Sequence, residues 1–198
     1  MWGDAETFAA NLGAESLRVD CTDLDGERFA LRRGFTKGAT SVESERLLNG
    51  TNSPPVPGLG DDRLASLHTL GPSWHEPFFE AAARLAGPDA MLSRDMFGQR
   101  VLCDESLQVV AMRRESVVGV CCVERIPATR SWFHIFTGVD IAFRNRGLAG
   151  AMKACVIRLA TAAGEQRLIA YNGETSATLG VNERLGFVRI GKRASYSR

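Results

Sequence analysis

The clearest chemical signal in the chain is a short basic, glycine-rich segment that directly follows an apolar run. Residues 144–150 read RNRGLAG; they come after the apolar run at residues 131–139 and before apolar side chains at helical spacing. This order predicts a strand, a tight turn and a helix. Small residues at Gly147, Ala149 and Gly150 would let backbone N–H groups approach an anion closely, and the helix dipole and both arginines favour negative charge there. The segment therefore predicts a binding site for a ligand that carries phosphates.

The same segment resembles a family signature. The string Arg144-Asn145-Arg146-Gly147-Leu148-Ala149 fits the Arg/Gln-x-x-Gly-x-Gly/Ala signature of the GNAT superfamily of acetyl-CoA-dependent N-acetyltransferases. A glycine-rich turn alone is a weak signal, but Thr137-Gly138-Val139 upstream and Leu185-Gly186-Phe187 downstream stand at the family's spacing. The resemblance covers residues 109–190. It implies an α/β fold with a mixed sheet, the GNAT-like acyl-CoA N-acyltransferase fold, with acetyl-CoA as cosubstrate and no metal.

The resemblance also implies where acetyl-CoA lies. The strand at 136–139 would splay from the next strand at 168–171 and admit the pantetheine arm, while backbone amides from 146 to 150 hold the pyrophosphate. A main-chain N–H near Val139 would donate to the thioester oxygen. The cofactor-binding residues implied in this way are Val139, Ile141, Arg144, Arg146, Gly147, Leu148, Ala149, Gly150, Asn172 and Asn182.

Acetyl transfer to an amine needs mainly two aligned substrates and a base that removes a proton from the incoming ammonium. Glu124 stands where an apolar strand ends, and His134 lies mid-strand, on a face that strict alternation shares with Trp132 and Phe136. Both are candidate bases. A solvated strand end for Glu124 and a core or surface imidazole for His134 remain the alternatives.

Two positions depart from the family pattern. Asn182 stands where relatives often place a tyrosine that protonates the departing thiolate, and an amide is not an acid near neutral pH. Either Asn182 only hydrogen-bonds the cofactor, or Tyr171 supplies the proton, or the thiolate leaves unaided. Asn172 is followed by Thr175 and Ser176 in place of a second asparagine four residues on, so a loop or capping role is its alternative.

The five cysteines are odd in number and lack the paired short spacing of zinc sites, which predicts buried, reduced thiols. Cys121 and Cys122 invite a covalent mechanism in which a thiol takes the acetyl group first. Their apolar setting at 117–123, with no adjacent His or cation in the sequence, predicts inert core thiols instead.

The overall charge gives no sign of a polyanionic partner. A formal net charge of +1 over 198 residues creates no global field that would attract nucleic acid or an anionic membrane. No apolar run approaches the length of a membrane span, and the N-terminus lacks the build of a secretion signal. We therefore expect a cytoplasmic protein without a nucleic-acid or membrane partner. The GNAT resemblance implies a small-molecule amine as its partner.

The chain contains a candidate internal repeat. Residues 13–35 align with residues 164–187, with one residue of slip, as glycine, short strand, acidic loop, helix and Gly-Phe. A chance match is the alternative. The strands are expected at 17–20 and 167–171, and the helices at about 25–33 and 176–185.

The predicted organisation follows from this repeat. Residues 1–48 form a partial N-terminal GNAT-like repeat without its own phosphate turn, residues 49–62 a proline- and glycine-rich linker, and residues 63–198 the acetyltransferase domain. Such a remnant resembles half of a domain of a tandem acetyltransferase, either cut from a longer protein or shortened in evolution. Its open sheet edge must pair with the second domain or with another copy, which leaves both monomer and homodimer open.

The second domain is expected to begin with short helices. Apolar spacing predicts helices at 64–70 and 76–85, and runs rich in Val, Leu and Cys predict strands at 99–103, 107–113 and 117–124. With the strand before the basic turn, these give an antiparallel run followed by a strand-helix-strand unit.

These observations together favour an N-acetyltransferase that transfers acetyl from acetyl-CoA to a primary amine of a small molecule, by direct attack in a ternary complex. Trp74, His75, Phe78 and Phe79 are candidates for lining the acceptor pocket, although one amphipathic helix packed on the sheet explains them equally well. The main alternative is a catalytically degenerate acyl-CoA-binding or interaction module. A nucleotide-binding protein is disfavoured because no Gly-Lys-Ser/Thr string is present.

Overall fold

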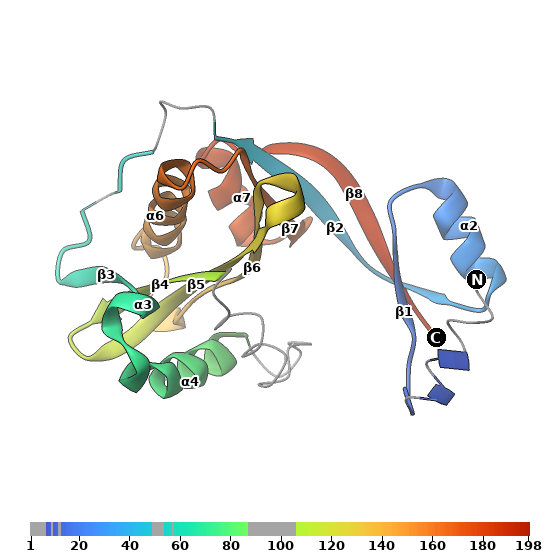
Figure 1. The fold of residues 1–198 in the computed structure, drawn as a ribbon, viewed down its shortest axis with the longest axis horizontal. Helices are drawn as coiled ribbons and strands as arrows, with labels where there is room; N and C mark the ends of the chain where they lie inside the picture. Colours follow the sequence, from blue (N-terminus) through green and yellow to red (C-terminus); the bar gives the residue numbers. More distant parts are fainter. Residues whose placement is uncertain (1–6, 9, 12, 49–53, 57, 87–105) are drawn as a thin grey trace. The chain divides into compact units, whose positions relative to one another are not determined.

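The computed structural model describes residues 7–8, 10–11, 13–48, 54–56, 58–86 and 106–198. It has a mixed α/β architecture in which eight strands follow the sheet order β1-β8-β2-β7-β6-β5-β4-β3 (Figure 1). This confirms the predicted fold class. The chain divides into a larger compact unit (44–170 with 176–188) and a smaller one (1–43 with 171–175 and 189–198).

The larger unit holds the antiparallel run and the strand-helix-strand unit that the sequence predicts. Its strands pair antiparallel from β3 to β6, and β6 then pairs parallel with β7 (Arg167–Gly173). The elements are β3 (Asp62–Ser66), α3 (Leu67–Leu70), η1 (Pro72–Trp74), α4 (His75–Ala86), β4 (Ser106–Arg113), β5 (Ser116–Ile126), η2 (Pro127–Thr129), β6 (Ser131–Val139), η3 (Ile141–Phe143), α6 (Leu148–Ala162) and α7 (Ala177–Arg184).

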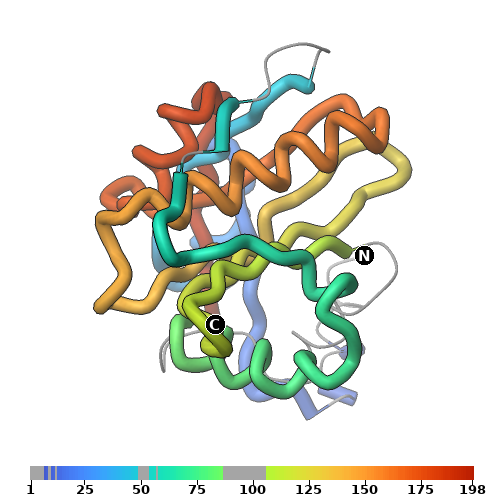
Figure 2. The backbone as a smooth tube through the Cα atoms, turned by 90° about the vertical axis from the view of Figure 1, so that its left-hand side faces the viewer, coloured from blue at the N-terminus to red at the C-terminus, as the bar shows by residue number. Residues whose placement is uncertain are grey.

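Helices cover both faces of the strands β4 to β6, as Figures 1 and 2 show. On one face, Met152 and Val156 of α6 pack with Cys121 of β5 in a first apolar core. On the other face, Phe78 of α4 packs with Cys122 in a second core. The strands are therefore buried on both sides, which explains why they read as continuous apolar runs.

One predicted helix is wrong in its first half. Residues 64–66 belong to the strand β3, which pairs antiparallel with β4, and only residues 67–70 form the short helix α3. Leu64 packs against the first core and Ala65 against the second, which is the alternation of a strand. Pairing with β4 therefore decides the conformation here. The predicted helix at 76–85 is confirmed as α4, and the predicted strand at 99–103 lies outside the described residues.

A bulge in β6 changes which side chains share a face. Cys122 pairs with Phe136 and Val123 pairs with His134, so Ile135 is an extra residue in β6. Trp132 packs against the core under α6, whereas Phe136 packs against the core under α4. The prediction that His134 shares a face with Phe136 is therefore wrong, because the bulge shifts the alternation by one residue.

The smaller unit contains β1 (Arg18–Cys21), α2 (Leu24–Arg32), the first part of β2 (Thr36–Leu47) and most of β8 (Val188–Ser197), with β1 antiparallel to β8. Both candidate repeat copies have the order strand, helix, long strand, as predicted. In the sheet order, the last strand of each copy stands beside the first strand of the other. A common origin of the copies, and the predicted domain boundaries, remain predictions.

Within the described residues, no helix combines the length and the apolar character that crossing a membrane requires. The same residues include no group of three or more His, Cys, Asp or Glu side chains arranged to hold a metal ion.

Candidate functional site

In the part of the chain that the structure describes, the N-cap residue of α6 provides no side-chain cap for the first backbone N–H groups of that helix. Gly147 is the N-cap residue with φ of 80°, a left-handed conformation that favours glycine, and it makes no side-chain capping hydrogen bond. The first turn of α6 carries no acidic side chain. The N–H groups of residues 148–150 lack partners within the helix by geometry, so the N-terminus of α6 carries partial positive charge toward an anion.

A cavity of about 640 Å³ opens at this helix N-terminus. Its lining comes from the end of β6, the basic turn, the first turn of α6, one face of α7 and a few residues of preceding segments. A Cβ atom added at Gly147 or at Gly150 would meet nothing within 4 Å, so both positions leave open space that a side chain would fill. The lining residues are Pro54, Pro55, Leu85, Thr137, Gly138, Val139, Phe143, Arg144, Asn145, Gly147, Leu148, Ala149, Gly150, Ala177, Thr178, Val181, Arg184 and Leu185.

Within the described residues, the pairing of β6 with β7 stops before the end of β6 that lies beside this cavity. Parallel pairing with β7 ends at Phe133 and Ile169, whereas β6 continues to Val139. The N–H of Asp140 donates to Val118 of β5 at 2.9 Å, and N–H directions alternate along a strand. The N–H of Val139 therefore points away from β5. The predicted splay of the two strands is present, and it exposes main-chain groups to the cavity.

Two arginines border the cavity, and one of them was missed by the sequence reading. Arg144 lines it and donates from Nε to the Val139 carbonyl at 3.0 Å, which ties the basic turn to the end of β6. Arg146 instead lies over the Phe143 ring, 5.2 Å from its centroid, and donates to Ala142. Arg184 of α7 supplies the second lining cation. No motif marked Arg184, because only the packing of α7 brings it to the turn.

Several predicted cofactor contacts do not line the cavity. Ile141 is 79% exposed, and Asn182 of α7 is fully buried, with its carbonyl accepting from the N–H of Phe187. Tyr171 and Asn172 belong to the smaller unit and are half-buried. Glu43 accepts a hydrogen bond from Tyr171. Burial is the larger cause that raises the pKa of the Tyr171 phenol, and this hydrogen bond is the second.

The predicted acceptor-side residues pack mainly into the core. Phe78 is fully buried, and Trp74 and Phe79 pack beside it, which is the amphipathic-helix alternative. Leu85 of the same helix reaches the cavity. Glu124 lies half-buried on β5, paired with Ser106 and away from the cavity lining.

A buried polar cluster lies under α6. Lys153 is 1% exposed and His134 is 7% exposed, and Lys153 Nζ lies 3.3 Å from His134 Nδ1. The Sγ atom of Cys121 lies 3.9 Å from the same nitrogen. Burial lowers the pKa of Lys153 to about 8, and burial together with Lys153 holds the pKa of His134 well below its usual value. Sequence reading missed Lys153 because its position shows no motif.

No His or cation is adjacent to Cys121 in the sequence, but the fold brings His134 and Lys153 beside it. Burial nevertheless raises the pKa of the Cys121 and Cys122 thiols, which keeps them protonated. Cys21 is also buried, Cys155 is half-buried, and Cys103 lies outside the described residues.

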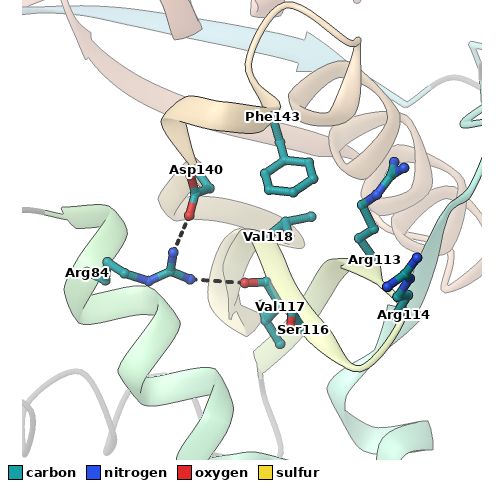
Figure 3. A pocket seen from close by; sticks show the side chains of 8 residues that line it. All are labelled: Arg84, Arg113, Arg114, Ser116, Val117, Val118, Asp140 and Phe143. Carbon is teal, nitrogen blue, oxygen red and sulfur yellow. Dashed lines mark hydrogen bonds and ion pairs between the residues drawn. The ribbon is translucent and has the colours of Figure 1, made fainter.

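A second cavity, of about 650 Å³, adjoins the end of β6 (Figure 3). Arg84 of α4 points toward Asp140 and the Val117 carbonyl; it pairs with the carboxylate and donates to the carbonyl at 3.1 Å. Arg113, on the far side of the cavity, pairs with Asp61 and Asp62. Two of the three arginines that line this cavity, Arg84 and Arg113, already have carboxylate partners, which weakens its attraction for an anion. Its Arg84 bridge instead anchors the strand end that carries Val139.

No family model matches the sequence, and no curated protein matches it. The solved structures that are similar to this chain include a tandem GNAT protein from the clavulanic acid biosynthesis pathway, with a TM-score of 0.75 and 16% identity, covering 100% of this chain and 68% of that one. They also include a GCN5-related N-acetyltransferase from Kribbella flavida (TM-score 0.73, 14% identity, covering 98% of this chain and 73% of that one) and one from Sphaerobacter thermophilus (TM-score 0.72, 14% identity, covering 92% of this chain and 59% of that one). The chain thus spans 59% of the length of the Sphaerobacter protein. The open β6 edge, the glycine turn and these likenesses lead to one conclusion: the chain has the fold of the GCN5-related N-acetyltransferases.

Proposed function

We propose that this protein is an N-acetyltransferase that uses acetyl-CoA to acetylate a primary amine of a small molecule. The observation that carries the proposal is the uncapped N-terminus of α6, where Gly147 and Gly150 leave open space in a cavity that continues to the free edge of β6. A diphosphate fits the first feature, and a peptide-like pantetheine arm fits the second, because it can hydrogen-bond to an unpaired strand.

In the proposed mechanism the chain acts mainly by holding acetyl-CoA in place and by polarising its thioester. The amides of residues 146–150 bind the diphosphate, and Arg144 and Arg184 add counter-charge. The N–H of Val139 stabilises the negative charge that grows on the thioester oxygen as the amine attacks its carbonyl carbon. The C–N bond forms, the C–S bond breaks, and CoA leaves as a thiolate that takes up the proton lost by the attacking nitrogen. Arg84, through Asp140, keeps this strand end in place.

The proposal also covers the acceptor, the cellular location and the partners of the protein. The acceptor is a small-molecule amine, and the protein works in the cytoplasm as a monomer or homodimer, without nucleic acid or membrane. Glu124 and Tyr171 do not line the described part of the cavity, and their catalytic roles stay predictions.

Gly150→Glu tests the cofactor site. Gly150 is helical, so this substitution avoids the backbone strain that any side chain would suffer at Gly147. A carboxylate about 4 Å from a phosphate charge costs about 4 kcal/mol at an effective dielectric constant of 20. We expect CoA affinity to fall by at least ~10²-fold in calorimetry, and turnover with amine panels to disappear. Ala162→Glu, an exposed position at the other end of α6, is the matched control and should bind CoA like the parent chain. Equal CoA affinity in both variants would refute the site.

A non-catalytic acyl-CoA-binding module is the second candidate. It is favoured by the absence of Glu124, His134 and Tyr171 from the described cavity lining and by the amide at Asn182. Calorimetry together with a free-thiol assay separates the two, because both bind CoA but only an enzyme releases it from acetyl-CoA in an amine-dependent way.

A further inference from the structure

The buried cluster under α6 is connected to the cavity by side-chain contacts. Thr137 lines the cavity, and its Oγ1 donates to the Sγ atom of Cys121 at 3.5 Å. Cys121 lies 3.9 Å from His134 Nδ1, and that nitrogen lies 3.3 Å from Lys153 Nζ. Hydroxyl, thiol, imidazole and amine thus form one unbroken chain of exchangeable protons that runs from the cavity into the core.

Among the described residues, no acidic side chain acts on Lys153 as a counter-charge for its ammonium form. The titratable groups that act on it are Cys121 from β5 and His134 from β6. The side chains that β4 and the segment after α7 contribute to this core are apolar, among them Val109, Ala111 and Phe187. An amine in such a place is readily neutral, and a neutral amine is a proton acceptor. Because a buried uncompensated lysine costs stability, its presence calls for a functional account.

We propose that Thr137, Cys121, His134 and Lys153 form a proton relay that takes the proton from the incoming ammonium and stores it on Lys153. This inference rests on the proposed acetyltransferase function. Only Thr137 would touch the substrate; Lys153 acts through the other three groups.

The relay balances in protons. Thr137 Oγ1 accepts a proton from the substrate ammonium and passes its own to Cys121 Sγ. The thiol passes its proton to His134 Nδ1, and from there the proton reaches Lys153 Nζ, which becomes an ammonium. The free amine then attacks the thioester. As the C–S bond breaks, the attacking nitrogen loses its second proton to the CoA thiolate. The proton stored on Lys153 returns along the same groups to the cavity and leaves to solvent, so the relay ends unchanged.

Adjacent cysteines provide a matched test. Cys121 and Cys122 are both fully buried, but Cys121 faces the cluster under α6 and Cys122 faces the core under α4. We expect Cys121→Ala to lower kcat at least tenfold, Cys121→Ser to restore it because a hydroxyl can also relay protons, and Cys122→Ala to stay within twofold of the parent chain. Each variant should bind CoA with parent affinity in calorimetry.

The pH profile of Lys153→Met separates a role in proton transfer from a purely structural role, because a structural role would leave the inflection of the profile unchanged. The parent kcat should rise with pH through an inflection near 8, the pKa of Lys153. In Lys153→Met, kcat should fall by ~10²-fold or more, which is typical for loss of acid–base catalysis, and the inflection should vanish. A variant that keeps the parent kcat and pH profile overturns the relay alone. A parent protein that binds CoA but acetylates no amine overturns the proposed enzyme function, and the relay falls with it.

Discussion

Replacement of Lys153 by methionine should stabilise the protein, and the gain should depend on pH. The pKa of Lys153 is lowered from 10.5 to about 8 by burial, and each pKa unit corresponds to about 1.4 kcal/mol, so burial of the ammonium costs roughly 3 kcal/mol below pH 8. Methionine has a similar length and no charge. The variant also loses the contact between Lys153 Nζ and His134 Nδ1, and this loss reduces the gain in stability by about 1 kcal/mol. The expected net gain at pH 7 is roughly 2 kcal/mol.

The sign of the pH dependence follows from the lowered pKa. Between pH 8 and 10.5 the unfolded chain binds more protons at Lys153 than the folded protein does, so the parent protein gains stability there as pH rises. Above that window the lysine is neutral in both states and its cost is gone. The gap between variant and parent should therefore be widest below pH 8 and close toward pH 10.5.

Urea denaturation of both proteins at pH 7 and pH 10 measures this gap directly. Lys192→Met, which removes an exposed lysine paired with Glu174, is the control and should change stability by less than about 0.5 kcal/mol. The chain has only three lysines, so the Cε signals of labelled lysine also report the pKa of Lys153 by NMR. A Lys153→Met protein that is less stable than the parent at pH 7, or a gap that is equal at both pH values, would show the burial argument to be wrong.

Three further substitutions and one control variant test the site, its supports and the energetic role of burial. Gly150→Ala should raise the free energy of unfolding by about 1 kcal/mol, because alanine is the better helix former. It should also weaken CoA binding, because its Cβ enters the open space of the turn. Thermal denaturation should therefore show a more stable protein, and calorimetry a lower affinity for CoA. Arg84→Ala removes the anchor of Asp140 and should lower kcat about tenfold with CoA affinity within twofold; an equal loss of both would place Arg84 in cofactor binding instead. Arg125→Ala leaves the buried carboxylate of Glu165 without its ion-pair partner, which lies at 2.6 Å in the parent protein. The free energy of unfolding, measured by urea denaturation, should fall by roughly 3 kcal/mol. Arg28→Ala, which breaks the exposed pair with Asp25, should cost under about 0.5 kcal/mol, and similar losses in these two variants would contradict the role of burial.

The sequence alone determined the strand, turn and helix at 131–162, because their signals are local. Apolar spacing marks α6, and glycine at position 147 marks a left-handed N-cap. The resemblance to the GNAT superfamily also predicted the splay beside Val139. The candidate repeat predicted its strands and helices for the same reason, since each copy carries its own turn residues.

Only the tertiary structure decided the parts that depend on pairing between distant segments. β3 is a strand because β4 offers it a partner, and the bulge at Ile135 appears only in the register with β5. Arg184 reaches the cavity through the packing of α7. Lys153 reads as a surface residue in the sequence, yet it is buried beside His134 and Cys121, because α6 packs with that side against the sheet. Burial and long-range contacts set the charge state of a side chain, and neither can be inferred from its neighbours in the sequence.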